Sequence, residues 1–180
     1  MSQNETLMLD VVPVAKTPSG GWSTWPAPFL AGCAEPPVAG APNLDGYWQT
    51  VEVVVGGVAV AGHRALGHVQ RIEQYGDRVI VTGGGIVHDM RCDGTIERGV
   101  HDVAEFDKVT EIRVVASYEN GVHVLRPQGM DIEVRRWRDG ARLVWDYLGF
   151  TAKLEWMAPS SAPPADVGDV SDVASLGLAR

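Results

Sequence analysis

Three side chains of this sequence have the types that acid–base chemistry uses: His88, Tyr118 and His101. On a strand, His88 shares a face with Ile86 and Met90, so an inward face would place its imidazole in an apolar cavity. Burial there lowers the pKa of a histidine and leaves a neutral base near pH 7. We therefore predict His88 as the base, with Tyr118 and His101 as the next candidates. The alternative is a partly exposed or hydrogen-bonded structural histidine, or a tyrosine that only packs in the core.

Two arginines fall in the apolar phase of their segments. Arg126 shares a phase with Val124, and Arg136 shares one with Val134. An interior arginine is costly to desolvate unless an anion or several acceptors meet it. The pair predicts a ligand with a carboxylate, enolate or similar oxygen. The alternative is that both lie at strand ends, where the guanidinium reaches solvent over the barrel rim.

Aromatic residues are suited to form the wall of a ligand site. Trp48, Tyr118, Trp145 and Tyr147 can pack against a flat or polycyclic body while their polar tips orient it. Ordinary core packing is the alternative role, and for Trp48 it is the better one.

The sequence offers little support for metal or nucleophile chemistry. A barrel can bring His63, His88 and His101 together from different strands, but no histidine pair has metal-ligand spacing, so we predict no metal. There is no Gly-x-Ser-x-Gly motif, and neither Cys33 nor Cys92 has a setting that suggests a reactive thiol.

Turn signals divide residues 46–157 into short segments. They are Gly76-Asp77, Asp93-Gly94, Asn120-Gly121 and Asp139-Gly140, which supply the residues that tight hairpins need. We expect strands at 47–55, 64–75, 78–83, 86–91, 96–104, 111–118, 122–127, 131–138, 141–148 and 150–157. Such a meander closes rather than leaving two edges open. The predicted class is all-β, a single antiparallel up-and-down barrel of 8–10 strands.

Three regions differ in composition. Residues 1–44 are rich in proline and glycine but carry large apolar side chains, so we expect a leader that packs on the barrel. Residues 45–158 form the barrel. Residues 159–180, rich in Ser, Ala, Pro and Asp, have the composition of a disordered tail.

Charge and composition narrow the partners and the compartment. The 180 residues carry a formal net charge of −8 without a basic stripe, so nucleic acid is not expected. The apolar run 51–61 is broken and far too short to span a bilayer, so no membrane is expected. The first residues lack a secretory signal, and two cysteines fit a reducing cytoplasm, although one disulfide stays open. A monomer and a homodimer are both open.

The first predicted strand opens with Gly46-Tyr47-Trp48. Gly-x-Trp at the start of an antiparallel meander resembles the lipocalin/calycin superfamily, over residues 46–157. The resemblance implies a barrel around a small, mostly apolar ligand and a leader that closes one barrel end. It also implies that Trp48 packs at the closed end against a basic residue, here Lys153 or Arg142.

Nitrobindins, which are calycin-like barrels, bind haem through a histidine near the C-terminal end. This chain has no histidine after His123 and lacks the glycine repetition of the nitrobindin opening. Haem is therefore the less favoured alternative, and no cofactor is expected.

Two functions follow for a small hydrophobic, anionic or oxygen-bearing ligand. The first is a cofactor-independent lyase, isomerase or cyclase, in which His88 moves a proton and an interior arginine stabilises the anionic intermediate. The second is a non-catalytic carrier or sensor that uses the same cavity. The interior polar groups favour the enzyme slightly.

Overall fold

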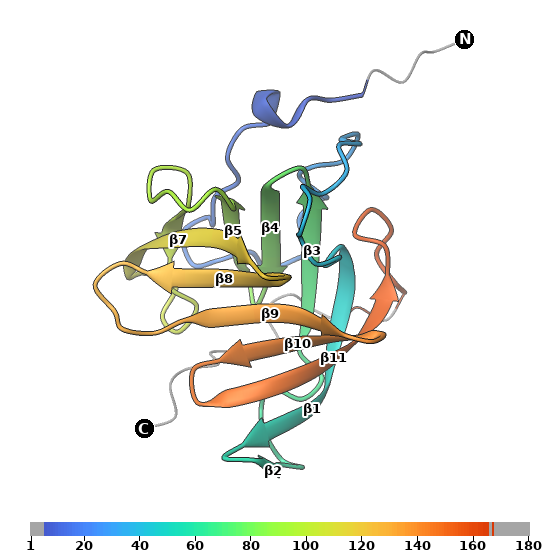
Figure 1. Cartoon of the computed structure of the whole chain (residues 1–180), viewed down its shortest axis with the longest axis vertical. Helices are drawn as coiled ribbons and strands as arrows, with labels where there is room; N and C mark the ends of the chain where they lie inside the picture. Colours follow the sequence, from blue (N-terminus) through green and yellow to red (C-terminus); the bar gives the residue numbers. More distant parts are fainter. Residues whose placement is uncertain (1–5, 166, 168–180) are drawn as a thin grey trace.

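The computed structural model describes residues 6–165 and 167, which form one nearly closed antiparallel β-barrel (Figure 1). A single 3₁₀ turn, η1 (Leu9–Val11), precedes eleven strands in this part of the chain. The strands are β1 (Gly46–Val55), β2 (Val58–Ala59), β3 (Val69–Tyr75), β4 (Arg78–Gly83), β5 (Ile86–Arg91), β6 (Val100–Val103), β7 (Glu111–Glu119), β8 (Val122–Pro127), β9 (Val134–Asp139), β10 (Arg142–Tyr147) and β11 (Phe150–Ala158). The all-β class predicted from the sequence is confirmed.

The strands form an up-and-down meander that closes through β1. The sheet order is β5-β4-β3-β1-β11-β10-β9-β8-β7-β6, and the short β2 pairs only with β1. The hydrogen bonds between β1 and β11 join the first and the last strand, and one seam without a ladder remains between β5 and β6. In Figure 1, β8, β9 and β10 cross in front of β3 and β4, so these strands form two facing walls.

All ten predicted strands exist, with differences at their ends. The Asn120-Gly121 turn has positive φ at both residues, 50° and 77°, as a tight hairpin requires. The segment predicted at 64–75 forms a strand only from Val69, because the residues before it fold into turns. The two-residue strand β2 was not predicted.

Steric constraints favour glycine at the first position of Gly46-Tyr47-Trp48. Gly46 has φ 141°, and a Cβ there would lie 2.2 Å from Nε1 of Trp156 and 3.0 Å from the carbonyl oxygen of Ala158. In the sequence, Trp156 alternates in phase with Ala152 and Leu154, which face inward. It is nevertheless half exposed, covers Gly46 and donates a hydrogen bond to the Asp45 carbonyl.

The interior cluster follows the predicted phases on most strands. Buried members from β7, β9, β10 and β11 are Val114, Ala116, Val134, Leu143, Trp145, Ala152 and Leu154. The phase predicted for β8 is wrong. His123 pairs across the sheet with Tyr118 and Arg136, so His123 faces inward and Arg126 faces outward. Both alternating sets of β8 contain apolar residues, and the neighbouring strands decide which one is inside.

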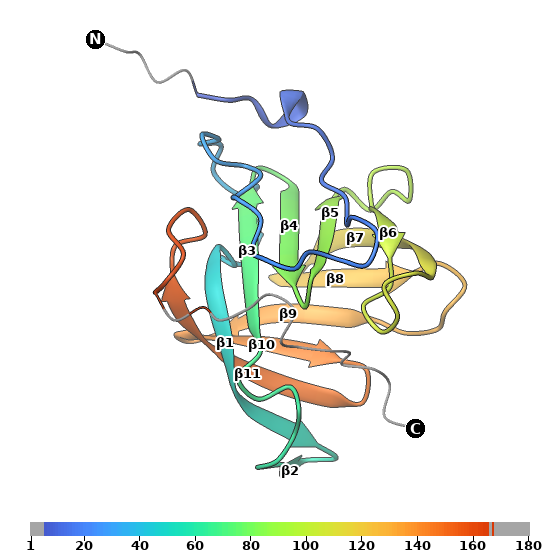
Figure 2. The same cartoon turned by 180° about the vertical axis from the view of Figure 1, so that it is seen from behind.

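The leader contacts the outer wall made by β3, β4 and β5 (Figure 2). Leu9, Leu30 and Cys33 pack there against Ile80 and Val87. The last leader residues reach an end of the barrel, which we call the closed end: Leu44 belongs to the interior cluster, and its N–H donates to Gln74 Oε1 at 2.8 Å.

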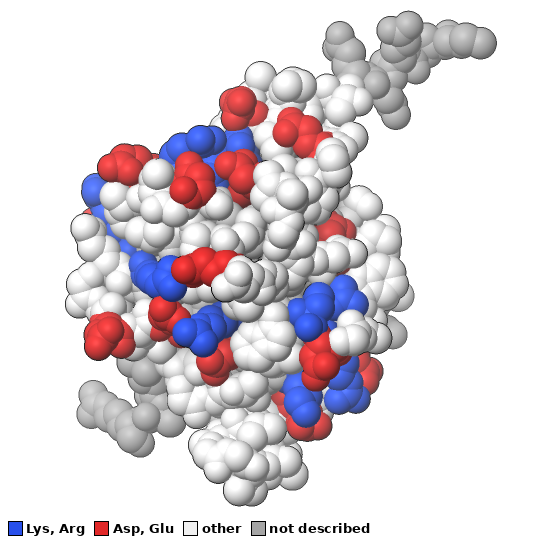
Figure 3. All heavy atoms as spheres, in the orientation of Figure 1, with Lys and Arg blue, Asp and Glu red and all other residues white. Residues whose placement is uncertain are grey.

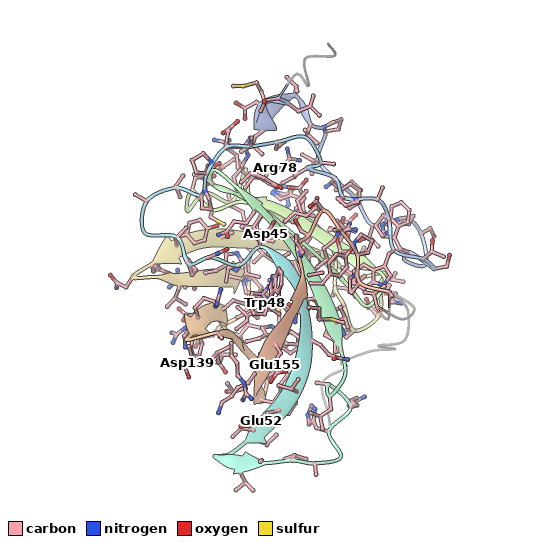
Figure 4. The ribbon with its side chains drawn as sticks, turned by 90° about the vertical axis from the view of Figure 1, so that its right-hand side faces the viewer. Asp45, Trp48, Glu52, Arg78, Asp139 and Glu155 are labelled. Atoms are coloured by element: carbon pink, nitrogen blue, oxygen red, sulfur yellow. The ribbon has the colours of Figure 1, made fainter. Side chains whose placement is uncertain are left out.

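Two buried arginines fix the leader on this wall. Arg78 lies beneath the leader (Figure 4) and forms an ion pair with Asp89 at 2.7 Å, while its guanidinium donates to the carbonyl oxygens of Leu9 and Val12. Arg71 donates to the Pro26 carbonyl and stacks against Trp25. The leader supplies backbone oxygens that a buried guanidinium needs, so these contacts attach the leader to the barrel wall.

The leader also joins the two sides of the seam. The Ala15 N–H donates to Asp89 on β5, and the Thr17 N–H donates to Asp102 on β6. Lys16 donates to the His101 carbonyl on β6. These contacts hold β5 and β6 together where the ladder is absent.

The remaining sequence predictions have mixed outcomes. Cys33 and Cys92 are both free and lie in different clusters, Cys33 under the leader and Cys92 in the interior. Of the predicted tail, residues 166 and 168–180 lie outside the described residues. Ser160 is buried and donates to Asp45 Oδ2 at 2.6 Å, which places the start of that segment against the barrel. Within the described residues, no helix is long and apolar enough to cross a membrane.

Candidate functional site: the cavity around Arg136

A cavity of about 90 Å³ lies inside the barrel. Its mouth is formed by Phe106 of the β6–β7 loop, Met130 of the β8–β9 loop and Leu148 after β10. The loops around residues 130 and 148 lie at the left of Figure 1, and the start of β1 lies at the right. The lining is mostly apolar, with four side chains that carry polar groups: His88, Glu105, Arg136 and Tyr147.

Arg136 is the buried charge of this cavity. Its side chain is 3 % exposed, its Nε donates to Gln70 Oε1 at 3.1 Å, and its guanidinium lies 5.4 Å from the Trp145 ring. Nη1 is buried and has no hydrogen-bond partner. Burial lowers the pKa of Arg136 to about 10, so the group stays charged at neutral pH.

A second, smaller chamber shares the lining residues Val81, Glu105 and Arg136 with the cavity. Its volume is about 10 Å³, and its polar lining is His68, Gln70, Glu105 and Arg136. That volume holds about one water-sized atom. Arg136 Nη1, Gln70 Nε2 and His68 Nδ1 are all buried without a partner. The guanidinium and the amide are both donors, so the chamber is suited to an acceptor atom.

Two interior histidines are neutral. Burial lowers the pKa of His68 to about 4 and that of His123 to about 3, and the nearby Arg136 charge adds to both effects. His68 faces the small chamber, whereas His123 lies beside Tyr118 with both ring nitrogens unpartnered. Neither histidine contributes a positive charge to the interior near pH 7.

Glu105 and Tyr147 supply the other polar groups. Glu105 lies in the β6–β7 loop, is partly buried, and lines both the cavity and the small chamber. Its carboxylate acts electrostatically on Arg136, His68 and Tyr147. Burial, followed by the charge of Glu105, raises the pKa of the Tyr147 hydroxyl well above its usual range.

Of the three predicted acid–base residues, only His88 lines the cavity. Its Nε2 lies 2.9 Å from the Val103 carbonyl oxygen, a contact that bridges the seam between β5 and β6. Because a carbonyl only accepts, this partner assigns the proton to Nε2 and leaves Nδ1 as the acceptor.

Tyr118 and His101 lie elsewhere. Tyr118 packs against the interior cluster, accepts a hydrogen bond from Gln74 Nε2 at 2.8 Å, and does not line the cavity. Burial, followed by the neighbouring Cys92, raises its hydroxyl pKa far above 10. His101 lies on the outer side of the barrel, with Nε2 2.7 Å from the Ile96 carbonyl. The structure therefore does not bring the three candidates together, and only His88 lines the cavity.

Arg126 is a second correction. It was predicted to face the ligand, but its side chain is 43 % exposed and forms ion pairs with Glu119 and Glu133 at 2.8 and 2.9 Å. Figure 3 shows basic and acidic side chains interspersed on the face of the molecule that it displays. Arg126 is exposed because it belongs to the set of β8 side chains that faces outward.

The predicted aromatic wall divides between the cavity and the core. Tyr147 lines the cavity, and Trp145 stacks on it at 4.8 Å while supporting Arg136. Trp48 lies at the other end and takes no part in the lining (Figure 4). Its Nε1 donates to the Leu44 carbonyl at 2.8 Å, and its ring lies 5.0 Å from the Arg138 guanidinium.

The basic partner of Trp48 is therefore Arg138 and not the predicted Lys153 or Arg142. Lys153 forms an ion pair with Glu52, and Arg142 forms one with Glu155, both on the surface. The cause is the order of the strands: Arg138 on β9 reaches the closed end, whereas the side chains of the other two point outward.

Sequence reasoning missed His68, Gln70 and Glu105. The strand phase of 64–75 is ambiguous by alternation, because β3 is buried on both faces, inside the barrel and under the leader. Glu105 lies in a loop, where alternation carries no information. For Gln70, one signal was present in the sequence: the predicted strand contains two uncharged polar side chains, Gln70 and Gln74.

The cavity does not fit haem. Its volume of about 90 Å³ is well below the roughly 300–1,000 Å³ of typical cofactor and drug-sized sites. No group of three or more His, Cys, Asp or Glu within residues 6–165 and 167 is placed to hold a metal ion. Comparisons with protein-family models, with curated proteins and with solved structures find no match for this chain.

Proposed function

We propose that the protein binds a small, apolar, oxygen-bearing organic molecule inside the barrel, as a carrier or sensor of lipocalin-like architecture. The observation that carries this proposal is Arg136. Arg136 lines a largely apolar cavity, and its buried Nη1 lacks a hydrogen-bond partner. A buried donor on a charged group without an acceptor is costly, so a ligand oxygen there gains a strong contact.

The surroundings of Arg136 support binding. Gln70 and Trp145 hold the guanidinium in one orientation, so little freedom remains to be lost when a ligand binds. Apolar side chains such as Met90, Ile112 and Leu125 line the space next to it. The volume restricts the enclosed part of the ligand to a few carbon atoms, and any larger part extends through the mouth.

The test compares two arginine variants. Arg136→Met removes the interior charge with little loss of volume, and Arg126→Met removes an arginine that is exposed on the same barrel. Small ketones, acids and alcohols are titrated into each protein, and calorimetry and mass spectrometry record binding and conversion.

Loss of a charge-assisted hydrogen bond of roughly 1.5–3 kcal/mol weakens binding to Arg136→Met about 10- to 150-fold. Arg126→Met should bind like the wild type. Equal affinity in both variants, or no binding of any compound, contradicts the proposal.

A second candidate function is proton transfer, because His88 lines the same cavity with Nδ1 as the free acceptor. For a carbonyl ligand, Nδ1 would take a proton from the carbon next to the carbonyl, Arg136 would hold the enolate oxygen, and the proton would return to carbon.

Exchange of α-protons for deuterium, followed by NMR in D₂O, measures this reaction directly. His88→Gln should bind the same ligand and lose roughly 10²- to 10⁴-fold in exchange rate. Exchange that persists in His88→Gln rules out His88 as the base, and a bound ligand that never exchanges leaves carriage as the function.

A further inference from the structure

The cavity lining already contains one acidic side chain beside its buried cation. Arg136 is the buried cation, and Glu105 is the acidic side chain that lines the same cavity and the small chamber. The two act on each other electrostatically, although no direct ion pair joins them in the described residues. The other interior groups, His68 and His123, are neutral. A ligand anion would therefore add an unbalanced negative charge next to Glu105.

The size of the small chamber also favours a neutral ligand over an anion. At about 10 Å³ it holds one oxygen atom. Its lining residues Arg136 and Gln70 each have a buried donor without a partner, Nη1 and Nε2, and the Gln70 amide is oriented by the hydrogen bond that its oxygen accepts from Arg136. Two donors around one acceptor site match the two lone pairs of a carbonyl oxygen. The second oxygen of a carboxylate would have to stay in the apolar cavity.

We infer that the ligand is neutral and places a single carbonyl oxygen between Arg136 and Gln70, and that Glu105 excludes carboxylates. This inference rests on the proposed function and assigns its ligand class: small aliphatic or alicyclic ketones, aldehydes and lactones. Glu105 is then the residue that sets specificity. It leaves the contact with a neutral carbonyl unaffected and repels an anion at the same position.

The test uses a pair of compounds with the same shape. Methyl isopropyl ketone and isobutyrate have the same number of heavy atoms and differ in one group, a methyl against a charged oxygen. In the wild-type protein at pH 7.5, NMR titration should show the ketone binding at least ten times more tightly than isobutyrate. The branched hexane of the same shape, which lacks oxygen, should bind more weakly than the ketone.

Glu105→Gln tests the cause of the selectivity. It should raise the affinity for isobutyrate about tenfold or more and change that for the ketone less than threefold. Glu111→Gln, which removes an exposed carboxylate outside the cavity lining, is the matched control and should leave both affinities unchanged.

The outcomes separate the inference from the proposed function. If isobutyrate binds the wild type as tightly as the ketone, or if Glu105→Gln leaves the ratio unchanged, the inference is wrong while the barrel still binds ligands. If neither compound nor any other small ketone or acid binds, the proposed function itself fails. A crystal structure of the ketone complex with a water in the chamber and the carbonyl toward the mouth also overturns the inference.

Discussion

Acid should destabilise this protein through His123 in a way that a single substitution can measure. His123 is fully buried, and burial lowers its pKa from 6.5 to about 3. In the unfolded chain the same imidazole takes up a proton near pH 6.5. The unfolded state therefore binds more protons between these values, and the stability present above pH 6.5 is lost as the pH falls toward 3.

The magnitude follows from the two pKa values. One proton taken up only by the unfolded chain changes the free energy of unfolding by about 1.4 kcal/mol per pH unit. His68, whose pKa is about 4, contributes a similar slope in the same direction. Together they give about 2.4 kcal/mol between pH 6 and 5, because the unfolded imidazoles are not yet fully protonated at pH 6. His123→Leu should reduce that slope by about half.

Urea denaturation at half-unit steps from pH 7.5 to 5 provides the measurement. At pH 7.5 His123→Leu should be as stable as the wild type or more stable, because it removes two ring nitrogens that have no partner. At pH 5 the free energy of unfolding of His123→Leu should exceed that of the wild type by about 2 kcal/mol or more. His101→Gln, on the outer side of the barrel, is the control. Equal slopes in the wild type and His123→Leu would refute a buried neutral His123.

Three further predictions concern stability and reactivity. Arg78→Met leaves Asp89 buried without its ion-pair partner and should lower the free energy of unfolding, measured by urea denaturation, by about 3–5 kcal/mol. The control Arg126→Met, at an exposed arginine, should lower it by less than about 1 kcal/mol. Equal losses in the two variants would contradict the leader contacts described above. Gly46→Ala introduces a Cβ against an indole and a backbone oxygen and should lower the melting temperature by several degrees, and an unchanged value would show that the start of β1 adapts. Burial raises the pKa of the Cys92 thiol to about 12, so at pH 8 a thiol reagent should label it only upon unfolding, and rapid labelling of the native protein would be inconsistent with that burial.

Ten of the eleven strands could be predicted because local signals and alternation agree, whereas the two-residue β2 and the seam between β5 and β6 were not predicted. Asn120-Gly121 fixes the turn between β7 and β8, and β10 and β11 carry one clearly apolar face each. For β8 alternation fails, since Leu125 makes the set that contains His123 as apolar as the set that contains Arg126. The position of the leader depends on buried side chains of β3 to β5, and no local pattern encodes those long-range contacts.

The candidate site was predictable only in part. Arg136 was found because its strand has one clearly polar face, and His88 was found by its two apolar neighbours on the same face. Gln70 was missed because β3 is covered on both sides, so its sequence shows no exposed set. Glu105 reaches the cavity through the path of a loop, which follows from the pairing of β6 with β7.

The central claim, that a small oxygen-bearing molecule occupies the barrel beside Arg136, is tested most directly by NMR on protein with ¹³C-labelled methionine methyl groups. Met90 and Met130 line the cavity, and Met8 is exposed on the leader. Titration with methyl isopropyl ketone should shift the Met90 and Met130 signals with one common affinity and leave Met8 in place, and Arg136→Met should weaken that affinity by tenfold or more. A Met90 signal that does not move, or shifts that are the same in Arg136→Met, would contradict the account.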